Sequence, residues 1–375
     1  MSNNKRIWLS SPHMGGHELK FIKEAFDTNW VAPLGPNVDN FEFDLANYLG
    51  EDRHVAALSS GTSAIHLALI LAGVEQGDYV ICQSLTFSAS ANPVIYQGGI
   101  PVFIDSEEET WNMSPQLMEE AIISCMKKKK KPKAIIVVHL YGMPAKMDEI
   151  LKIAAYYEIP VIEDAAEALG SSLKNQRCGT FSEFGILSFN GNKIITTSGG
   201  GALICRNSEL ASRARFLSTQ ARDNAPYYQH STIGYNYRMS NILAGIGRGQ
   251  MIVLDERIEK RRQNNRFYRD SFRNINGIVF QSEPDEHYYS NFWLTAILID
   301  PQEYGMTNEQ LRLAMEKKNI ESRRLWKPMH LQPVFKEAPF FGNDIAEKLF
   351  ETGLCIPSGS NLGQDDLTAV TDCFR

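Results

Sequence analysis

Short apolar runs alternate with longer amphipathic stretches over the first two-thirds of the chain. The pattern predicts βαβ units and a mostly parallel sheet, because short β-rich runs follow one another with helical segments between them. The expected helices include residues 61–74 and 114–127. The expected strands are HVAAL (54–58), YVICQ (79–83), IPVFID (100–105), AIIVVHL (134–140), IPVIED (159–164), FGILSF (184–189) and GALIC (201–205).

The pattern changes toward the C-terminus. A long, mostly uninterrupted helix is predicted from Arg238 to Arg273. Beyond it the order is strand, helix, strand, with NFWLTAILID, then TNEQLRLAMEKKNI, then a segment rich in Pro, Trp and His. This change predicts a large α/β domain over residues 1–250 and a smaller α+β domain over residues 251–375.

Composition narrows the classes of function. Hydrophobic residues make up 43% and charged residues 22% of the chain, as in ordinary globular proteins. The net charge of -6 gives no overall attraction to nucleic acid or to an anionic membrane. The opening has no apolar signal segment, and no apolar run approaches the ~20 residues that span a bilayer. Six singly placed cysteines favour free thiols over disulfides or zinc. We expect a soluble cytoplasmic protein with no metal, nucleic-acid or membrane partner.

The first candidate for chemistry is SSGTSAIH (59–66), which joins the first strand to the first helix. Gly61 permits a tight turn, and Thr62 with Ser63 can present hydroxyl and backbone N–H groups at a helix N-terminus. Such a terminus is a ready phosphate site. An ordinary Ser/Thr helix cap has the same sequence, so this segment alone leaves both interpretations open.

A pair of acids, Glu163 and Asp164, falls at the carboxyl end of the strand IPVIED. Ligands bind outside the carboxyl ends of strands in open α/β sheets. Only one of the two carboxylates can point inward, because side chains alternate along a strand. An inward acid could pair with a cationic ring nitrogen, although a carboxylate at a strand end is as often a cap or a surface group.

Lys193 stands in SFNGNKIITTSGGGALI (188–204), among residues that let backbones and ligands approach closely. Ser188 and Asn190 lie at a tight turn around Gly191, after an apolar strand. Lysines are usually at the surface, but the charged neighbours of a solvated face are missing here. A lysine in a confined, partly dry site has a depressed pKa and becomes a nucleophile toward carbonyl groups.

Together the three segments supply a phosphate cradle, an acid for a pyridinium nitrogen and a lysine that can form a Schiff base. These are the parts that pyridoxal 5'-phosphate (PLP) needs. Each is weak evidence alone, and their order and spacing along the chain make the combination specific. PLP is therefore the predicted cofactor.

The sequence also resembles a known family across nearly the whole chain. The blocks SGTSAIHLAL, TFSASANPV, PVFIDS, VHLYG, IEDAAEALGS, SFNGNKIITTSGGGAL and GYNYRMSNILAGIG look like the signature segments of the DegT/DnrJ/EryC1/StrS family. Its members are PLP-dependent aminotransferases that act on nucleotide-linked keto-sugars. The resemblance implies PLP fold type I, which is aspartate-aminotransferase-like, with a mostly parallel sheet of the seven-stranded type. It also implies a homodimer with active sites at the interface.

The resemblance assigns roles to matching positions. Lys193 is expected to be the Schiff-base lysine and to carry a proton between cofactor and substrate carbons. Asp164 is expected to pair with the pyridinium nitrogen and keep it protonated. The remaining cofactor contacts are expected from Gly61, Thr62 and Ser188 at the phosphate, Asn236 of the neighbouring subunit, also at the phosphate, and Phe87 stacked on the ring.

One position departs from the family's commoner pattern. Glu167 stands three residues after Asp164, near the cofactor's ring hydroxyl, where members often have Gln or His. A carboxylate beside a phenolate oxygen is repulsive unless it is protonated or bonded elsewhere. The hypothesis is that Glu167 contacts the ring oxygen in its protonated form or touches the sugar.

A second segment, ESRRLWKPMHLQPVF (321–335), resembles the stretch that lines the substrate site in nucleotide-sugar aminotransferases. Arginine and lysine suit a diphosphate through their charge and multiple donors. Packing of Trp326 in the small domain and a structural role for His330 are equally good interpretations. The residues expected near the diphosphate and sugar are Arg324, Trp326, Lys327 and His330, with Arg238 from the partner subunit.

The combination of blocks most resembles the bacillosamine-pathway aminotransferases. These transfer an amino group from L-glutamate to C4 of UDP-2-acetamido-4-keto-2,4,6-trideoxyglucose. Enzymes of the GDP-perosamine, 4-amino-arabinose and pseudaminic-acid types are close alternatives.

Three other functions fit less well. PLP-dependent sugar dehydratases replace the lysine with histidine, which Lys193 contradicts. A non-catalytic PLP-binding regulator would need a DNA-binding element or a basic face, and the sequence offers neither. A nicotinamide-dependent oxidoreductase would have G-x-G-x-x-G after the first strand, which is missing.

Overall fold

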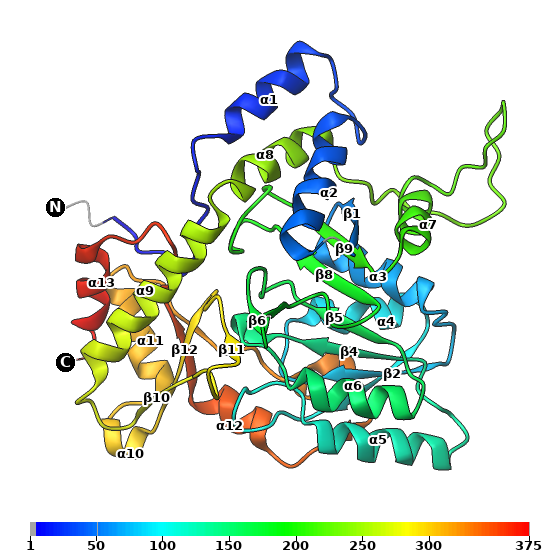
Figure 1. Ribbon diagram of the computed structural model, residues 1–375. Coiled ribbons are helices and arrows are strands. Elements are labelled where there is room, and N and C mark those ends of the chain that lie inside the picture. Colours follow the sequence, from blue (N-terminus) through cyan, green and yellow to red (C-terminus); the bar gives the residue numbers. More distant parts are fainter. Residues whose placement is uncertain (1–4, 51, 375) are drawn as a thin grey trace.

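An eight-stranded sheet forms the larger part of the computed structural model, which describes residues 5–50 and 52–374 (Figure 1). Of its strands only β9 runs antiparallel to its neighbours, so the predicted mostly parallel sheet is confirmed. The expected strands all join it, and a short strand from near the C-terminus is added at one edge. In spatial order the strands are β1 (His54–Leu58), β9 (Gly201–Cys205), β8 (Phe184–Ser188), β5 (Val161–Asp164), β4 (Ala134–Val138), β2 (Tyr79–Gln83), β3 (Ile100–Ile104) and β14 (Phe340–Phe341).

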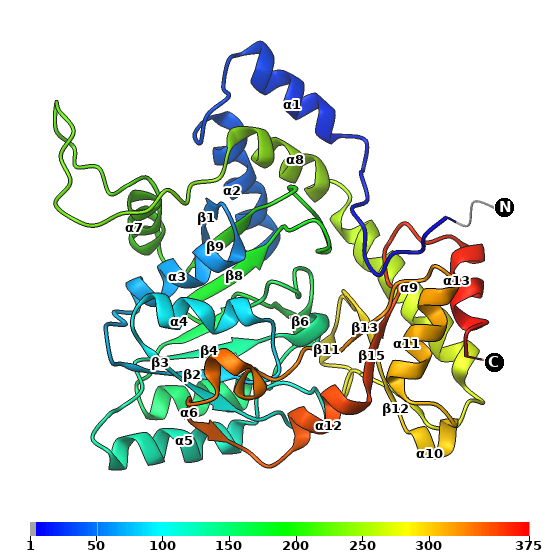
Figure 2. The same cartoon turned by 180° about the vertical axis from the view of Figure 1, so that it is seen from behind.

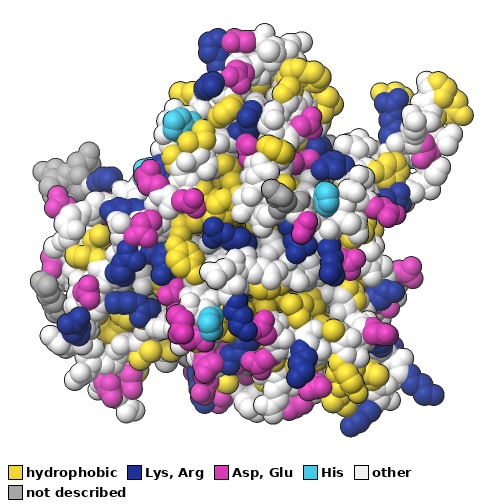
Figure 3. Space-filling model, in the orientation of Figure 1, with side chains coloured by type: hydrophobic (Ala, Val, Ile, Leu, Met, Phe, Trp, Pro, Cys, Tyr) yellow, Lys and Arg dark blue, Asp and Glu magenta, His cyan; other side chains and the backbone are white. Residues whose placement is uncertain are grey.

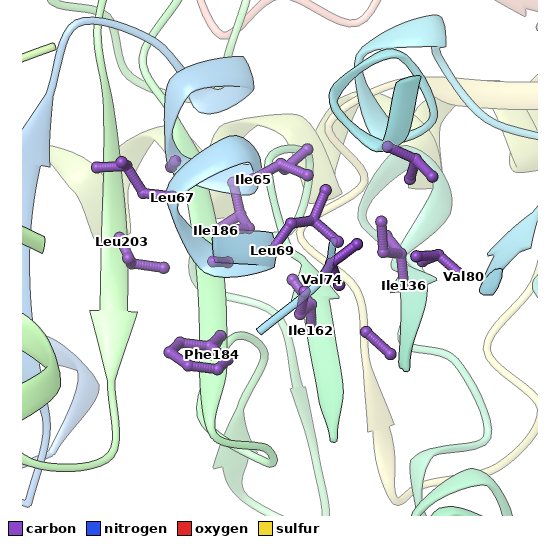
Figure 4. Close-up of a cluster of buried hydrophobic side chains, with 14 of the residues drawn as sticks. Ile65, Leu67, Leu69, Val74, Val80, Ile136, Ile162, Phe184, Ile186 and Leu203 are labelled. Carbon is purple, nitrogen blue, oxygen red and sulfur yellow. The ribbon is translucent and has the colours of Figure 1, made fainter. Parts of the chain in front are cut away.

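Helices cover both faces of this sheet, because successive side chains of each buried strand point to opposite sides. On one side Ile136 and Ile162 belong to one buried cluster with Leu69 of the first covering helix (Figure 4). On the other side Ile135 packs with Met118. The first face carries α3 (Gly61–Leu71), α4 (Asn92–Tyr96) and α7 (Ser208–Ser218), and the second carries α5 (Pro115–Lys127) and α6 (Met147–Tyr156).

A group of three helices lies at the β1 end of the sheet (Figures 1 and 2), where Phe41 and Leu45 share a buried cluster with Val55 of β1 and Ile204 of β9. They are α1 (Glu18–Asp27), α2 (Pro36–Leu49) and α8 (Asn241–Met251). Glycines on α8 allow this helix to pack closely against α1 and α2. A Cβ at Gly247 would lie 2.6 Å from the Phe41 ring, and one at Gly249 would lie 2.7 Å from the Glu18 backbone.

The prediction of one uninterrupted helix from Arg238 to Arg273 is wrong. The structure has two helices there, α8 and α9 (Leu254–Phe272). Val253 leaves the helical region, with φ −109° and ψ 7°, and this interrupts the chain of helical hydrogen bonds.

The smaller part of the molecule has its own antiparallel sheet and core. Its strands, in order, are β10 (Ile278–Phe280), β12 (Thr295–Ile299), β15 (Gly353–Ile356) and β13 (Arg323–Arg324). This sheet packs on α9, α11 (Asn308–Lys317) and α13 (Gln364–Thr371). Nearby are α10 (Pro301–Tyr304), α12 (Ile345–Thr352) and a small sheet of β11 (Tyr288–Tyr289), β6 (Ser172–Leu173) and β7 (Gln176–Arg177).

Both ends of the chain cross between the two parts. Ile7 forms a parallel bridge with Ile320 in the smaller part. In the other direction, β14 pairs in parallel with β3 of the large sheet. The division of the chain at residue 250 therefore stays a prediction.

The segment 222–234 projects from the body of the molecule after α7 (Figures 1 and 2). Hydrophobic side chains gather on it (Figure 3). Tyr228 is 80% exposed and Ile233 is 82% exposed. Within the described ranges, no helix is long and apolar enough to cross a membrane.

Candidate active site

The site lies where three strands of the large sheet end. β1, β5 and β8 finish at the same edge, and β9 begins there because Gly201 pairs with both Leu58 and Ser188. A cavity of about 220 Å³ opens at this edge. Of the predicted site residues it is lined by Gly61, Thr62, Phe87, Asp164, Glu167, Ser188, Lys193 and Trp326.

The N-terminus of α3 forms one wall of the cavity. Ser60 caps the helix, and its hydroxyl accepts a hydrogen bond from the Ser63 N–H at 3.0 Å. Helix geometry leaves the N–H groups of Gly61 and Thr62 without intrahelical partners. A Cβ at Gly61 would lie 3.2 Å from Ser188 Cβ, so the glycine lets β8 approach the helix start. This wall suits a phosphate, which helix N-termini bind through backbone N–H groups.

Asp164 is the acid that points into the cavity. Its carboxylate is 5% exposed and accepts hydrogen bonds from the Ser90 hydroxyl at 2.6 Å and from the Ala166 N–H at 3.2 Å. Glu163 points to the opposite side, where it accepts from the Gly179 N–H at 2.7 Å. The alternation expected for the two acids is therefore present, and it selects Asp164.

Lys193 enters the cavity from the loop between β8 and β9. Its Nζ lies 3.8 Å from Glu167 Oε1 and 4.1 Å from the centre of the Trp293 ring. Burial lowers the pKa of the Lys193 amine, and the negative charges of Glu167 and Asp164 oppose this only in part. A lysine with a lowered pKa holds more of its amine uncharged and nucleophilic.

Glu167 is buried beside this lysine. Its Oε2 accepts a 2.6 Å hydrogen bond from the Tyr141 N–H. Burial raises the pKa of Glu167, and the charge of Lys193 opposes that rise. The Tyr141 hydroxyl in turn accepts from the Trp326 N–H at 2.9 Å. The acid therefore touches the lysine directly and the C-terminal segment through Tyr141.

Two aromatic rings flank the opening of the cavity. Phe87 and Trp326 have ring centres 5.3 Å apart, and Phe87 is 52% exposed. The indole Nε1 of Trp326 is buried at the cavity wall, and its interaction with the Glu167 carboxylate opposes the rise in the pKa of that acid.

The other predicted substrate residues of the C-terminal segment lie outside the cavity lining. His330 is held by Ser84 Oγ at 2.7 Å and Glu347 Oε1 at 3.1 Å, and its ring stacks on Phe340. Arg324 donates to the Phe350 carbonyl at 3.0 Å. For His330 these contacts match the structural role that the sequence left open. Lys327 is exposed.

The two residues expected to act on a neighbouring subunit also lie outside this chain's own cavity. Asn236 is exposed at the base of the projecting segment 222–234, where it forms a bridge with Thr219. Arg238 pairs with Glu42 and donates to the Ala57 carbonyl at 3.0 Å. Its side chain is 8% exposed, so the guanidinium is largely enclosed within its own subunit.

Sequence reasoning missed several residues of the site. Ser90 ends the TFSAS block, whose last three residues form the 3-10 turn Ser88–Ser90. Its place in that block was the one feature of the sequence that pointed to it. No feature of the sequence pointed to Trp293, because it is far from Lys193 along the chain and contacts the lysine only in the folded protein. The remaining lining residues, which were not predicted as site residues, are Ser59, Ser60, Ile65, Thr86, Ala89, Val138, Ala166, Asn190, Asn192, Gly199 and Gly200.

The residues present fit PLP. One cavity combines an anion site at a helix N-terminus, a buried carboxylate and an amine of lowered pKa. A phosphate, a ring nitrogen and an aldehyde need these three groups. Elsewhere the described residues contain no cluster of three or more side chains placed to hold a metal ion.

Comparison with known proteins agrees with this reading of the cavity. Residues 12–375 match the model of the DegT/DnrJ/EryC1/StrS aminotransferase family. The chain is 50% identical over 98% of its length to EpsN of Bacillus subtilis (strain 168), whose assigned name is that of a pyridoxal phosphate-dependent aminotransferase, and covers 95% of it. It is 35% identical to the GDP-perosamine synthase of Escherichia coli O157:H7, covering 99% of this chain and 98% of that one.

Comparison with solved structures indicates the same family. A DegT DnrJ EryC1 StrS aminotransferase from Brucella abortus superposes with a TM-score of 0.89 at 28% identity, over 96% of this chain and 94% of that one. The architecture is thus PLP fold type I, and the resemblance seen in the sequence is confirmed. The chain belongs to the DegT/DnrJ/EryC1/StrS aminotransferase family and is a PLP-dependent sugar aminotransferase.

Proposed function

We propose that the enzyme transfers an amino group from L-glutamate to C4 of UDP-2-acetamido-4-keto-2,4,6-trideoxyglucose. The observation that carries amino transfer is the convergence of the Lys193 amine, the Asp164 carboxylate and the α3 N-terminus in one cavity. The choice of sugar is supported by the segment 321–335, of which Trp326 reaches the cavity. Bound PLP supplies an aldehyde that takes up the amino group and a ring that accepts electrons.

Each residue of the cavity has a part in this reaction. The Lys193 amine would hold the cofactor, and once free it could move a proton to or from the substrate carbon. Asp164, oriented by Ser90, would keep the ring nitrogen protonated. Gly61 and Thr62 would bind the phosphate with Ser188 close to them. Phe87 would cover the ring, and Glu167 would contact the ring oxygen or the sugar.

The substrate needs cations that this cavity lacks. Among the described residues that line it, Lys193 is the single lysine or arginine. A diphosphate and the carboxylates of glutamate are normally bound by several fixed charges and donors. We therefore propose that exposed Lys327 and groups from a second subunit complete the site.

A homodimer is the arrangement that supplies those groups. The projecting segment 222–234 exposes the large hydrophobic side chains of Tyr228 and Ile233, and such exposure is typical of protein–protein interfaces. Asn236 at its base would then reach the partner's phosphate site. Arg238 would serve the partner's site only after leaving Glu42, so we assign it to support of the segment. We also place the enzyme in the cytoplasm, since its six cysteines are free and buried.

The test is an absorbance titration of the purified protein with PLP. A visible band that is lost with L-glutamate and restored by the UDP-keto-sugar establishes the donor, the cycle and the sugar. Loss without restoration keeps the aminotransferase and rejects the sugar. The variant Lys193→Ala must lack the band, with Lys174→Ala as the exposed control; a normal band in Lys193→Ala rejects the lysine assignment.

A GDP-linked 4-keto-6-deoxy sugar is the second candidate. It is favoured by relatives named GDP-perosamine synthase, which are 35% and 34% identical over nearly the whole chain. The two candidates separate when both keto-sugars are supplied to the glutamate-treated enzyme. The substrate with the higher kcat/KM for restoring the band is the one to retain.

A further inference from the structure

Arg261 of α9 is a buried cation without a carboxylate partner. Its side chain is 1% exposed, and no ion pair is described for it within residues 5–50 and 52–374. Burial lowers the pKa of Arg261 to about 9, and the nearby charge of Arg257 adds to the effect. Burying such a group is unfavourable unless its donors are satisfied. The contacts that Arg261 makes should therefore explain its position.

Those contacts join three separate parts of the chain. Nη1 donates to the Trp293 carbonyl at 2.6 Å and to the Ser358 carbonyl at 3.4 Å. Nη2 donates to the Ser10 hydroxyl at 2.9 Å. The Nε of Arg261 is buried and has no hydrogen-bond partner among the described residues. The guanidinium thus engages all three acceptors through its two terminal nitrogens, a geometry that an ammonium group cannot reproduce.

Two of these partners also donate side-chain hydrogen bonds to one and the same backbone carbonyl. The Ser10 hydroxyl donates to the Asn192 carbonyl at 2.7 Å, and the Trp293 indole Nε1 donates to it at 2.6 Å. Asn192 immediately precedes Lys193, and the Trp293 ring lies 4.1 Å from the lysine Nζ. The route from Arg261 to the lysine thus passes through one serine or one tryptophan and a single carbonyl.

We propose that Arg261 is a positioning residue that fixes the Lys193 loop by orienting Ser10 and Trp293 against the Asn192 carbonyl. The inference rests on the proposed function, in which Lys193 is the reactive amine. Arg261 itself does not line the cavity, but it bonds directly to Trp293, which does. Since α9 and Ser358 belong to the smaller part of the molecule, this contact also ties that part to the reactive loop.

The experiment compares Ser10→Ala and Arg261→Lys with two matched controls. Ser11→Ala changes the adjacent serine, whose hydroxyl has no described bond to Asn192, and Arg266→Lys changes an exposed arginine of the same helix. The first readout uses the cofactor-free protein: the pH at which formaldehyde and borohydride half-label Lys193, measured by mass spectrometry. The second readout is kcat and KM of the PLP-loaded enzyme.

We expect the labelling midpoint to rise in both test variants, because a loosened amine gains water and its pKa moves back toward that of an ordinary lysine. We expect kcat to fall about five- to twentyfold with little change in KM, since small misplacements of a reacting group slow the chemical step. Both controls should match the unmodified protein.

A lower melting temperature with an unchanged labelling midpoint would show a purely structural role and overturn the proposal. If Arg261→Lys does not fold, Ser10→Ala decides alone, because Ser10 is only partly buried. The proposed function is judged separately: a normal visible band in Lys193→Ala would reject it, whatever the Ser10 result.

Discussion

Nζ of Lys193 and Oε1 of Glu167 lie 3.8 Å apart, with the two side chains 13% and 5% exposed. Burial disfavours the charged form of each group, so the pKa of the lysine falls and that of the acid rises. Their mutual attraction opposes both shifts. The pair therefore keeps an exchangeable proton close to the reactive amine.

Replacing Glu167 by Gln should lower the pKa of Lys193 further, because the negative charge that supports its ammonium form is removed. The amide oxygen of Gln can still accept from the Tyr141 N–H. More of the amine is then uncharged at neutral pH, so its labelling there should be faster, about tenfold for roughly one pKa unit. Amine labelling of the cofactor-free protein across pH gives the midpoint. An unchanged midpoint together with unchanged turnover would show that Glu167 has no part in the site; Glu109→Gln, at an exposed ion pair, is the control.

Replacing Lys193 by Met should stabilise the cofactor-free protein at pH 7. The folded pKa of Lys193 is below its ordinary value of 10.5, so between the two values the unfolded chain binds more protons. The stability of the unmodified protein therefore rises with pH across that window. The advantage of the Met variant should shrink as pH approaches 10.5. Urea unfolding at several pH values measures it, with Lys152→Met as an exposed control; parallel pH profiles of the variant and the unmodified protein would contradict the assignment.

Replacing Asp164 by Asn should slow amino transfer by at least about 10²-fold, as expected for loss of a buried charge aimed at the reacting group. PLP should still bind, because the phosphate site is untouched. Ser90→Ala, which removes the 2.6 Å bond to the carboxylate, should slow transfer about tenfold. Single-turnover loss of the visible band with glutamate measures both. Ser88→Ala in the same 3-10 turn is the control, and equal rates in Ser88→Ala and Ser90→Ala would remove Ser90 from the site.

Replacing Gly201 by Ala should damage the phosphate site. The new Cβ would lie 2.3 Å from the Ser60 carbonyl carbon and 2.4 Å from the Gly61 nitrogen, so backbone must move. We expect a loss of about 1–3 kcal/mol of stability and weaker PLP binding, measured by denaturant unfolding and PLP titration. Gly191→Ala is the control, since its Cβ would meet only Pro12, at 3.9 Å. Equal PLP affinity in the two variants would show that this close approach does not shape the cradle.

Mixed dimers test whether Asn236 acts across the interface. Neither Lys193→Ala nor Asn236→Ala should be active alone at limiting PLP. Unfolding and refolding an equal mixture should restore about a quarter of normal activity, because half of the dimers are hybrids and each has one complete site. A mixture of Lys193→Ala with Asp164→Asn should stay inactive, since both residues serve the same cavity. Restoration in that second mixture, or none in the first, would contradict the arrangement.

Local sequence patterns predicted the large sheet well because its strands are buried on both faces and read as apolar runs. The run HVAAL coincides with β1, and GALIC with β9. The turn chemistry around Lys193 and the acid at the end of β5 were equally visible. The break at Val253 was not, because it depends on one residue's backbone angles within an unbroken helical pattern.

Side chains that act through distant contacts were also hidden. His330 and Arg324 have the residue types of a phosphate site, yet tertiary neighbours engage them in packing. Trp293 reaches the lysine only because the smaller part of the molecule folds against the larger. The spacing of residues along the sequence does not predict such contacts between distant segments.

The pairing of β14 with β3 has a consequence for how the protein is made. During synthesis β3 emerges early, but Phe340 and Phe341, which cover its outer edge, emerge only when most of the chain is complete. Until then the nascent sheet presents an open row of backbone donors and acceptors, the feature that promotes aggregation of incomplete chains. Truncated products that end before residue 340 should therefore be insoluble, and the last segment of the chain acts as a cover for the first domain to appear.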